Sequence, residues 1–406
     1  MGTGWGRLQA VAVSGSAGEG LLLTALPLLA ITITTDPRQV ALVNVVGQAP
    51  WLLFSLAAGV LIDRFRRTSV LAVAFAVQAV AAAALAVAAT TGTLSLPLLL
   101  VVAFVVTSAQ VLGDGASGAL VPDVVGPDRL AAANARMIVI ERGVVQFVVP
   151  PATGFLLAVA AGLPAWLACA TALAAVVLTR GIAVPHVPSP PGHPLRDVRT
   201  GLAFLVGSPL LRTITLSVAL GAFAASATQA MFVLYATQVL HVGPVGYGVL
   251  LACLAAGWIA ASFVVHPVVT RLGYAWSMRL ASTAAGVGSV LIAVLPARPA
   301  LIAATLVAVS STTLVWNVCS QSSRQRFTPT PLLGRVLTSH RALAWGLTPL
   351  GALAGGFVAA HWGLRWVWGM AAVVQLLAVA LTWRTLSPQG FAEEEARVAA
   401  SLPDRA

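Results

Sequence analysis

Long, continuous apolar runs restrict the fold of this chain more than any other feature of its sequence. Each run is about 20 residues long, enough for a helix to cross the ~30 Å hydrocarbon core of a bilayer. Their continuity excludes a transmembrane β-barrel, whose strands alternate apolar and polar residues. We therefore predict an all-α integral membrane protein with 12 transmembrane helices at the following approximate residues: 8–34, 39–62, 69–90, 96–119, 137–161, 163–183, 213–237, 247–269, 278–295, 299–320, 338–360 and 364–384.

The arginines predict how these helices are oriented. All 23 basic residues are Arg, and a cytoplasmic N-terminus would place 20 of them on the inner side, leaving Arg38, Arg298 and Arg365 outside. Because basic residues concentrate on the cytoplasmic side of membrane proteins, both termini are predicted to be cytoplasmic. The same rule accounts for the net charge of +11. No basic patch is interleaved with aromatic residues, so we expect no nucleic-acid partner.

A Pro-rich connection after the sixth run divides the chain into halves. Leu195, Val198 and Leu202 share one stripe of a short helix in this connection, typical of a helix on the inner membrane surface. The predicted domains are an N-terminal six-helix bundle at 1–183, a linker with this surface helix at 184–212, a C-terminal six-helix bundle at 213–384 and a solvated cytoplasmic tail at 385–406.

The two halves also share sequence features. A shift of 199 residues superposes three residues at the start of the fifth run on three at the start of the eleventh: Arg136 on Arg335, Arg142 on Arg341 and Pro150 on Pro349. Such matches are typical of membrane proteins built from two repeats.

Glu19 is the only acidic residue near the middle of a predicted span. It follows Leu8 by 11 residues, about 17 Å along a helix axis. A carboxylate at that depth is costly unless it faces a cavity or a partner. Glu19 is therefore the candidate for coupling protons or a cationic substrate. The alternative is a protonated carboxyl group that only packs against a neighbouring helix.

The loop after the second run carries the most specific motif, Gly59-Val-Leu-Ile-Asp63-Arg64-Phe-Arg66-Arg67. It resembles the signature between the second and third helices of the major facilitator superfamily. Further stretches resemble the exporter branch that includes the bacterial enterobactin exporter and macrolide-efflux-like permeases. These stretches are 16–20, 49–54, 120–123, 129–134, 201–204 and 345–356.

This resemblance implies the major facilitator fold, two pseudo-symmetric six-helix bundles that alternately open a central cavity to either side. It also implies a secondary transporter that exports a hydrophobic or amphipathic small molecule, such as a drug, antibiotic, siderophore or other secondary metabolite, in antiport with protons. Two alternatives are an uptake permease or uniporter for a small or lipid-like solute, and a non-transporting membrane protein that kept the fold.

Charged residues near the cytoplasmic plane could form an ion-pair network that closes an inner gate. In the superfamily the acid of the loop motif, here Asp63, is thought to clamp the halves against the start of the eleventh helix. For Asp114 a polar helix end is an equally good interpretation. The predicted gate residues are Gly59, Asp63, Arg64, Arg67, Asp114, Asp123, Arg136, Glu141, Arg142, Arg335 and Arg341.

The fifth run contains Pro150, Pro151 and Gly154, which resemble a degraded form of the Gly/Pro motif of exporters. They predict either a simple kink or a helix that seals the transporter. Polar and Trp side chains inside the spans are candidates for lining a substrate cavity, although each is also compatible with a lipid-facing or core position. The cavity candidates are Trp51, Gln146, Gln229, Trp258, Trp316, Asn317 and Trp345.

Enzyme motifs are missing from the sequence. A P-loop needs a Lys, and the chain has none; no cluster of Cys and His with metal-ligand spacing and no nucleophile elbow occurs. We therefore predict no enzyme activity, cofactor or metal. The expected partners are a small-molecule substrate, protons and the lipid bilayer, and the protein is expected to be a monomer in the bacterial inner membrane.

Overall fold

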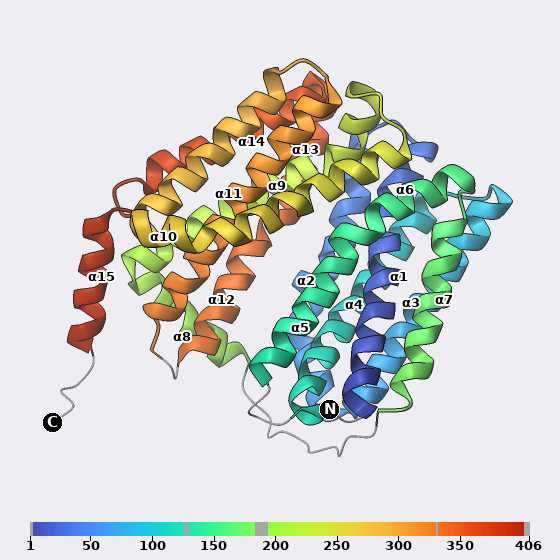
Figure 1. The fold of residues 1–406 in the computed structure, drawn as a ribbon, viewed down its shortest axis with the longest axis horizontal. Helices are drawn as coiled ribbons and strands as arrows, with labels where there is room; N and C mark the ends of the chain where they lie inside the picture. The colour runs from blue at the N-terminus through green and yellow to red at the C-terminus, as the bar shows by residue number, and fades with distance from the viewer. Residues whose placement is uncertain (1–2, 126–129, 183–193, 330–331, 402–406) are drawn as a thin grey trace. The chain divides into compact units, whose positions relative to one another are not determined.

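The computed structural model describes residues 3–125, 130–182, 194–329 and 332–401. Within these ranges all regular elements are helices, as Figure 1 shows. The elements are α1 (Thr3–Ile33), α2 (Pro37–Arg64), α3 (Arg67–Thr91), α4 (Leu96–Val124), α5 (Leu130–Gly143), η2 (Val144–Val148), α6 (Val149–Val159), α7 (Leu163–Thr179), α8 (Pro194–Gly207), α9 (Pro209–Leu234), η3 (Tyr235–Val239), α10 (Pro244–Val294), α11 (Pro299–Arg326), α12 (Leu333–Gly346), α13 (Thr348–Trp362), α14 (Leu364–Thr382) and α15 (Pro388–Ser401).

Proline and glycine set many of the helix ends. Helices α2, α8, α9, α10, α11 and α15 each begin at a Pro, whose fixed φ suits the first helical turn. Before α2, Asp36 Oδ1 accepts a hydrogen bond from the backbone N–H of Arg38 at 2.9 Å, a typical N-cap. Gly92, with φ of 71°, ends α3, and Gly363, with φ of 96°, separates α13 from α14. Positive φ at these turns favours glycine.

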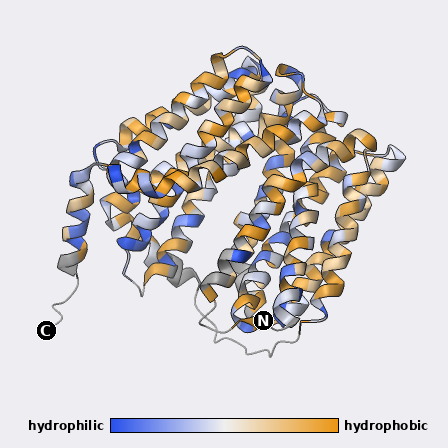
Figure 2. Cartoon of the chain, in the orientation of Figure 1, coloured by the Kyte–Doolittle hydropathy of each residue, from blue (hydrophilic) through white to orange (hydrophobic). Residues whose placement is uncertain are grey.

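The helices account for the 12 predicted spans. Eight of the described helices are long and apolar enough to cross a membrane, judged by length and composition. One of the eight, α10, consists of two helices joined at Gly273, which has φ of 71° and ψ of 168°. The elements α5, η2 and α6 form one span, as do α12 and α13. Most residues along these helices are hydrophobic (Figure 2), as expected for helices surrounded by lipid.

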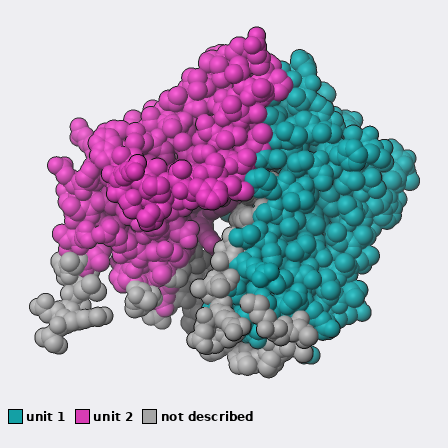
Figure 3. All heavy atoms as spheres, viewed as in Figure 1, with its two compact units in different colours: residues 1–192, 233–252 teal, residues 193–232, 253–406 magenta. Residues whose placement is uncertain are grey.

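The chain divides into two compact units, coloured separately in Figure 3. The first unit comprises residues 1–192 and 233–252, and the second comprises 193–232 and 253–406. This division is based on contacts and does not test the domain boundaries predicted at residues 183, 212 and 384, which stay a prediction.

In the first unit, small residues let the helices approach closely. Helix α7 packs against α1 and α3, and α4 packs against α2 and α3. Ala82 and Ala86 of α3 and Ala165, Ala168 and Ala172 of α7 are fully buried. Close approach through small residues replaces the hydrophobic effect as the source of helix association in membranes.

The second unit uses glycines in the same way. In α13, a Cβ atom at Gly351 would clash with the backbone of Phe223 in α9, and one at Gly355 would lie 2.6 Å from the carbonyl oxygen of Ala227. Helix α8, the predicted linker helix, packs on α12, where Gly201 lies against the backbone of Arg335.

One helix in each half is interrupted at the same place relative to a proline. Helix α6 begins at Val149 with Pro150 as its second residue, directly after η2. Helix α13 begins at Thr348 with Pro349 as its second residue, shortly after α12 ends at Gly346. These prolines are the pair superposed by the 199-residue shift, so the repeat in the sequence is also a repeat of local structure.

The C-terminal residues differ from the solvated tail that their acidic sequence predicts. They form α15, which is markedly hydrophilic (Figure 2). The ring of Phe391 stacks on Tyr274 and meets Phe327 edge-on, with ring centroids 6.4 and 5.9 Å away. Arg326 at the end of α11 forms an ion pair with Glu395 at 2.7 Å. Phe391 and Val398 pack against the apolar cluster of the second unit, so this helix is anchored although its sequence is acidic.

Candidate transport site

Glu19 lies at the centre of α1, between two glycines that bring other helices close. A Cβ atom at Gly18 would lie 2.9 Å from Thr171 Oγ1 of α7, and one at Gly20 would lie 3.0 Å from a methyl carbon of Val149 in α6. Close packing on both sides holds the backbone of α1 in place around Glu19. The Glu19 side chain is partly exposed.

The carboxylate of Glu19 accepts a hydrogen bond from the Gln110 amide Nε2 of α4. Sequence reasoning missed Gln110. The available signal was an isolated amide within the apolar run 96–119, which had no assigned partner. An amide can donate to a charged carboxylate and can accept from a protonated carboxyl. Gln110 can therefore partner Glu19 in both of its protonation states.

A π-helical segment lies beside this pair. Element η2 covers Val144–Val148, and the N–H of Val149 donates to the carbonyl of Val144, five residues back. Pro150 and Pro151 supply no N–H, and a proline ring clashes with the carbonyl four residues earlier, which widens the helix before it. Gly20 contacts the backbone of Val145 in this segment. The fifth run is thus interrupted by a π-helical segment directly before its prolines, and this segment adjoins the helix that carries Glu19. The predicted kink stays a prediction.

The same prolines and glycines form a reciprocal helix crossing within the first unit. A Cβ atom at Gly154 would clash with the backbone carbonyl of Pro244 in α10. In return, a Cβ atom at Gly248 would clash with the carbonyl of Pro150 in α6. Each helix presents a Pro and a Gly four residues apart, so the two backbones touch with no side chain between them.

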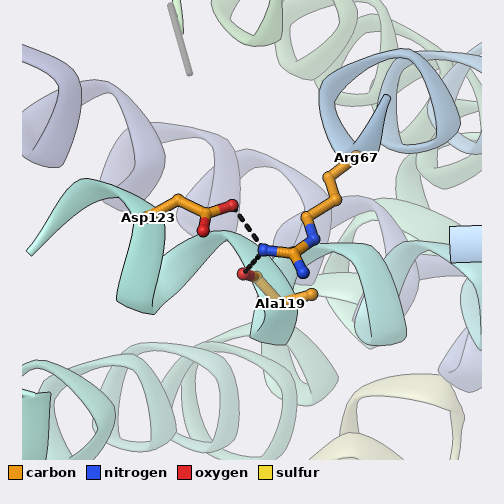
Figure 4. Close-up of polar contacts among 3 residues, drawn as sticks. All are labelled: Arg67, Ala119 and Asp123. Carbon is orange, nitrogen blue, oxygen red and sulfur yellow. Dashed lines mark hydrogen bonds and ion pairs between the residues drawn. The ribbon is translucent and has the colours of Figure 1, made fainter. Parts of the chain in front are cut away.

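At the other end of the first unit, one predicted gate pair is in direct contact (Figure 4). Arg67 at the start of α3 forms an ion pair with Asp123 in the last turns of α4, with Nη1 and Oδ2 2.5 Å apart. The same Nη1 donates to the carbonyl of Ala119 at 2.9 Å. Both charged side chains are about one quarter exposed, at 25% and 26%. The pair joins the loop motif to α4.

The other predicted gate residues are placed individually. Asp114 and Arg136 are exposed on α4 and α5, and Glu141 is partly exposed. Arg64 ends α2 and is exposed, as are Arg335 and Arg341 on α12. The side chains of Gly59, Asp63 and Arg142 lie outside the described residues. A network that includes all of these groups therefore stays a prediction.

The cavity candidates divide between the units. Trp51 of α2 is in the first unit and exposed; in the second unit Gln229, Asn317 and Trp345 are exposed. Trp258 is partly buried. Trp316 packs against an apolar cluster that includes Met278 and Phe327, which is a core contact. The side chain of Gln146 lies outside the described residues.

Within the described residues, an all-helical arrangement of 12 spans, with an interrupted helix in each half and a carboxylate at the centre of the first span, has the architecture of a major facilitator transporter. The comparisons with known proteins agree. The chain belongs to the transmembrane secretion effector family of this superfamily, which it matches over residues 10–404. The predictions of the superfamily, of a transporter and of no enzyme activity are confirmed.

The chain is similar to curated and solved transporters. It is 26% identical over 361 residues to the multidrug efflux pump Tap of Mycobacterium tuberculosis, covering 84% of this chain and 83% of Tap. The structure of a bacterial homologue of the iron transporter ferroportin in its inward-facing state matches with a TM-score of 0.77 at 16% identity, covering 94% of this chain and 98% of that one. A mutant of the nucleoside transporter NupG matches with a TM-score of 0.76 at 12% identity, covering 94% and 99%. These structures confirm the predicted fold.

Proposed function

We propose that this protein exports a hydrophobic or amphipathic small molecule in exchange for protons, with Glu19 as the carboxylate that gains and loses the proton. The observation that carries the proposal is the hydrogen bond between Glu19 and the neutral partner Gln110. An amide donates to the charged carboxylate and accepts from the protonated carboxyl group, so it stabilises both forms. The contact with Gln110 can therefore persist while Glu19 gains and loses a proton.

The partial exposure of Glu19 also supports this role. A coupling carboxylate has to be reached by protons, yet it must lie in an apolar span for its charge to matter energetically. Exchange follows if the charged form without substrate cannot reorient, because each passage then needs either a proton or a substrate. The named activity of the relative Tap, multidrug efflux, agrees with an amphipathic substrate.

The two ends of the first unit have separate parts in the proposed cycle. The Arg67–Asp123 pair fixes the loop motif that the superfamily uses at its inner gate. At the crossing of Gly154 and Gly248 the two helix backbones are in direct contact. We therefore propose that this crossing seals the end of the first unit opposite the Arg67–Asp123 pair. We further propose that the protein is a monomer in the bacterial inner membrane with both termini in the cytoplasm.

Transport by purified protein tests the role of Glu19. In proteoliposomes with an imposed pH gradient, Glu19→Gln should abolish gradient-driven accumulation of a lipophilic fluorescent cation such as ethidium. Because the amide cannot exchange a proton, the variant should retain counterflow of the same compound without a gradient. Accumulation at the wild-type level by Glu19→Gln would refute the coupling role.

A matched control uses the same substitution elsewhere. Glu393 is exposed on α15, and Glu393→Gln should transport like the wild type. The wild type is also tested with neutral amphipathic compounds. If it shows counterflow neither of ethidium nor of these compounds, the protein does not transport this class of substrate.

A further inference from the structure

The second unit contains a long stretch of sequence without any carboxylate. Between Asp197 and Glu393 there are 11 arginines and no Asp or Glu. Most of these arginines lie near helix ends, where water or lipid headgroups can solvate them. A cation buried within the stretch has no acidic neighbour in sequence to balance its charge.

Arg324 is such a buried cation. It lies in the last turns of α11 and is only 9% exposed. Its Nη1 donates to Ser320 Oγ at 2.7 Å, while its Nε has no acceptor among the described residues. A guanidinium has five N–H donors in a planar fork, and a single hydroxyl satisfies only one of them.

A second cation and a histidine lie beside Arg324. Arg341 of α12 is close enough for its positive charge to act on Arg324, and both charges act on His340. His340 is 4% exposed and is held by a hydrogen bond between its Nδ1 and Thr215 Oγ1 of α9 at 3.0 Å. Helices α11 and α12 therefore bring two arginines and a histidine together, and the positive charges of the two arginines repel one another. Arg341 is exposed, so the cluster reaches the surface of the unit.

Other arginines of the second unit have defined partners. Arg326, two residues after Arg324, pairs with Glu395 at 2.7 Å. Arg279 donates to the carbonyl of Trp383 and lies over the rings of Trp276 and Trp383. Among the described residues no carboxylate pairs with Arg324. Arg326 therefore has a carboxylate partner, whereas Arg324, two residues earlier, has none among the described residues.

We propose that Arg324 and Arg341, next to His340, form a binding site for an oxyanion, a carboxylate or phosphate group. A buried cation next to a second cation is unfavourable unless an anion binds to them. The planar guanidinium fork matches the geometry of these oxyanions, and Ser320 fixes one edge of it. The group can come from an anionic phospholipid headgroup or from a soluble anion. The site depends on neither Glu19 nor the direction of transport.

Direct binding to the full-length protein tests the site. In one arm, protein in a neutral detergent is titrated with inorganic phosphate by calorimetry. In the other, phosphatidylglycerol or phosphatidylcholine is added in mixed micelles, and bound lipid is counted by native mass spectrometry. Phosphate binding identifies a soluble anion as a ligand, and selective retention of phosphatidylglycerol identifies a headgroup; either result supports the proposal.

Variants assign the binding to the cluster. Arg324→Gln should weaken binding roughly tenfold or more, since hydrogen bonds to charged groups are lost. Arg341→Gln changes an exposed side chain and keeps the test decisive if Arg324→Gln does not fold. The matched control, Arg326→Gln, removes an equal charge two residues away and should bind like the wild type. Equal weakening by Arg326→Gln would overturn the proposal, as would a wild type that binds neither probe.

Discussion

At the residue scale, the contact between Gln110 and Glu19 decides how the central carboxylate behaves. We predict that Gln110→Leu slows gradient-driven transport by roughly ten- to hundredfold, because a hydrogen bond to a charged group contributes about 1.5–3 kcal/mol. Counterflow, which needs no change of protonation, should fall much less. The measurement is the ratio of the two rates in proteoliposomes. Gln238 in η3 is exposed, so Gln238→Leu is the control; an unchanged ratio in Gln110→Leu would contradict the assigned role of Gln110.

The sequence pattern indicated Glu19 as a candidate for proton coupling but did not indicate Gln110 as its hydrogen-bond partner, and the reason is physical. A carboxylate in an apolar run is conspicuous because the free energy cost of burying it is large. An amide in an apolar run costs less and has many satisfactory environments, so Gln110 could not be paired with Glu19 before the register of α1 against α4 was known. Arg67 and Asp123 were both predicted as members of a gate network. The two residues are 56 positions apart in sequence, so their direct pairing depends on tertiary structure.

At the scale of elements, the crossing of α6 and α10 makes two glycines indispensable. We predict that Gly154→Ala and Gly248→Ala each lower stability by about 1–3 kcal/mol, because a methyl group would clash with a backbone carbonyl that cannot move aside easily. Thermal unfolding in detergent measures the loss. Gly143 provides the control within the same span, since a Cβ atom there meets no atom within 4 Å. Gly143→Ala should leave stability unchanged or raise it, because Ala favours helix.

The spans themselves followed from apolar runs and charge, while their internal breaks did not. Pro150 predicted a kink, yet the π-helical turn at Val144–Val148 depends on how the neighbouring helices accept the wider turn. Gly273 lies in a short polar connection within α10. Its positive φ, which the sequence did not predict, marks the point at which the two spans of α10 are joined. The docking of α15 depends on Phe391 finding Tyr274 and Phe327, contacts more than 60 residues away in sequence.

At the scale of the whole molecule, the two halves carry different charges despite their shared fold. Glu19 and all described acids before residue 192 belong to the first unit, whereas the spans of the second contain arginines and no carboxylate. Side-chain carboxylates are the groups that can carry protons through an apolar span at neutral pH when His is absent or fully engaged. Proton exchange is therefore expected in the first unit and anion binding in the second, a division of labour within one repeated architecture.

This division predicts the site of attack by a hydrophobic carbodiimide. Such reagents enter the bilayer and add to protonated carboxyl groups, forming a stable acylurea. We expect dicyclohexylcarbodiimide to modify Glu19 and to abolish gradient-driven transport, because Glu19 is partly exposed at the centre of α1. Peptide mass spectrometry locates the adduct. The counterflow that Glu19→Gln retains should resist the reagent, since Glu19 is the only acidic residue near the middle of a predicted span. If the adduct forms on Asp114 or Glu141 and transport is lost while Glu19 stays unmodified, then the proton is carried by one of those acids and the centre of α1 has another purpose.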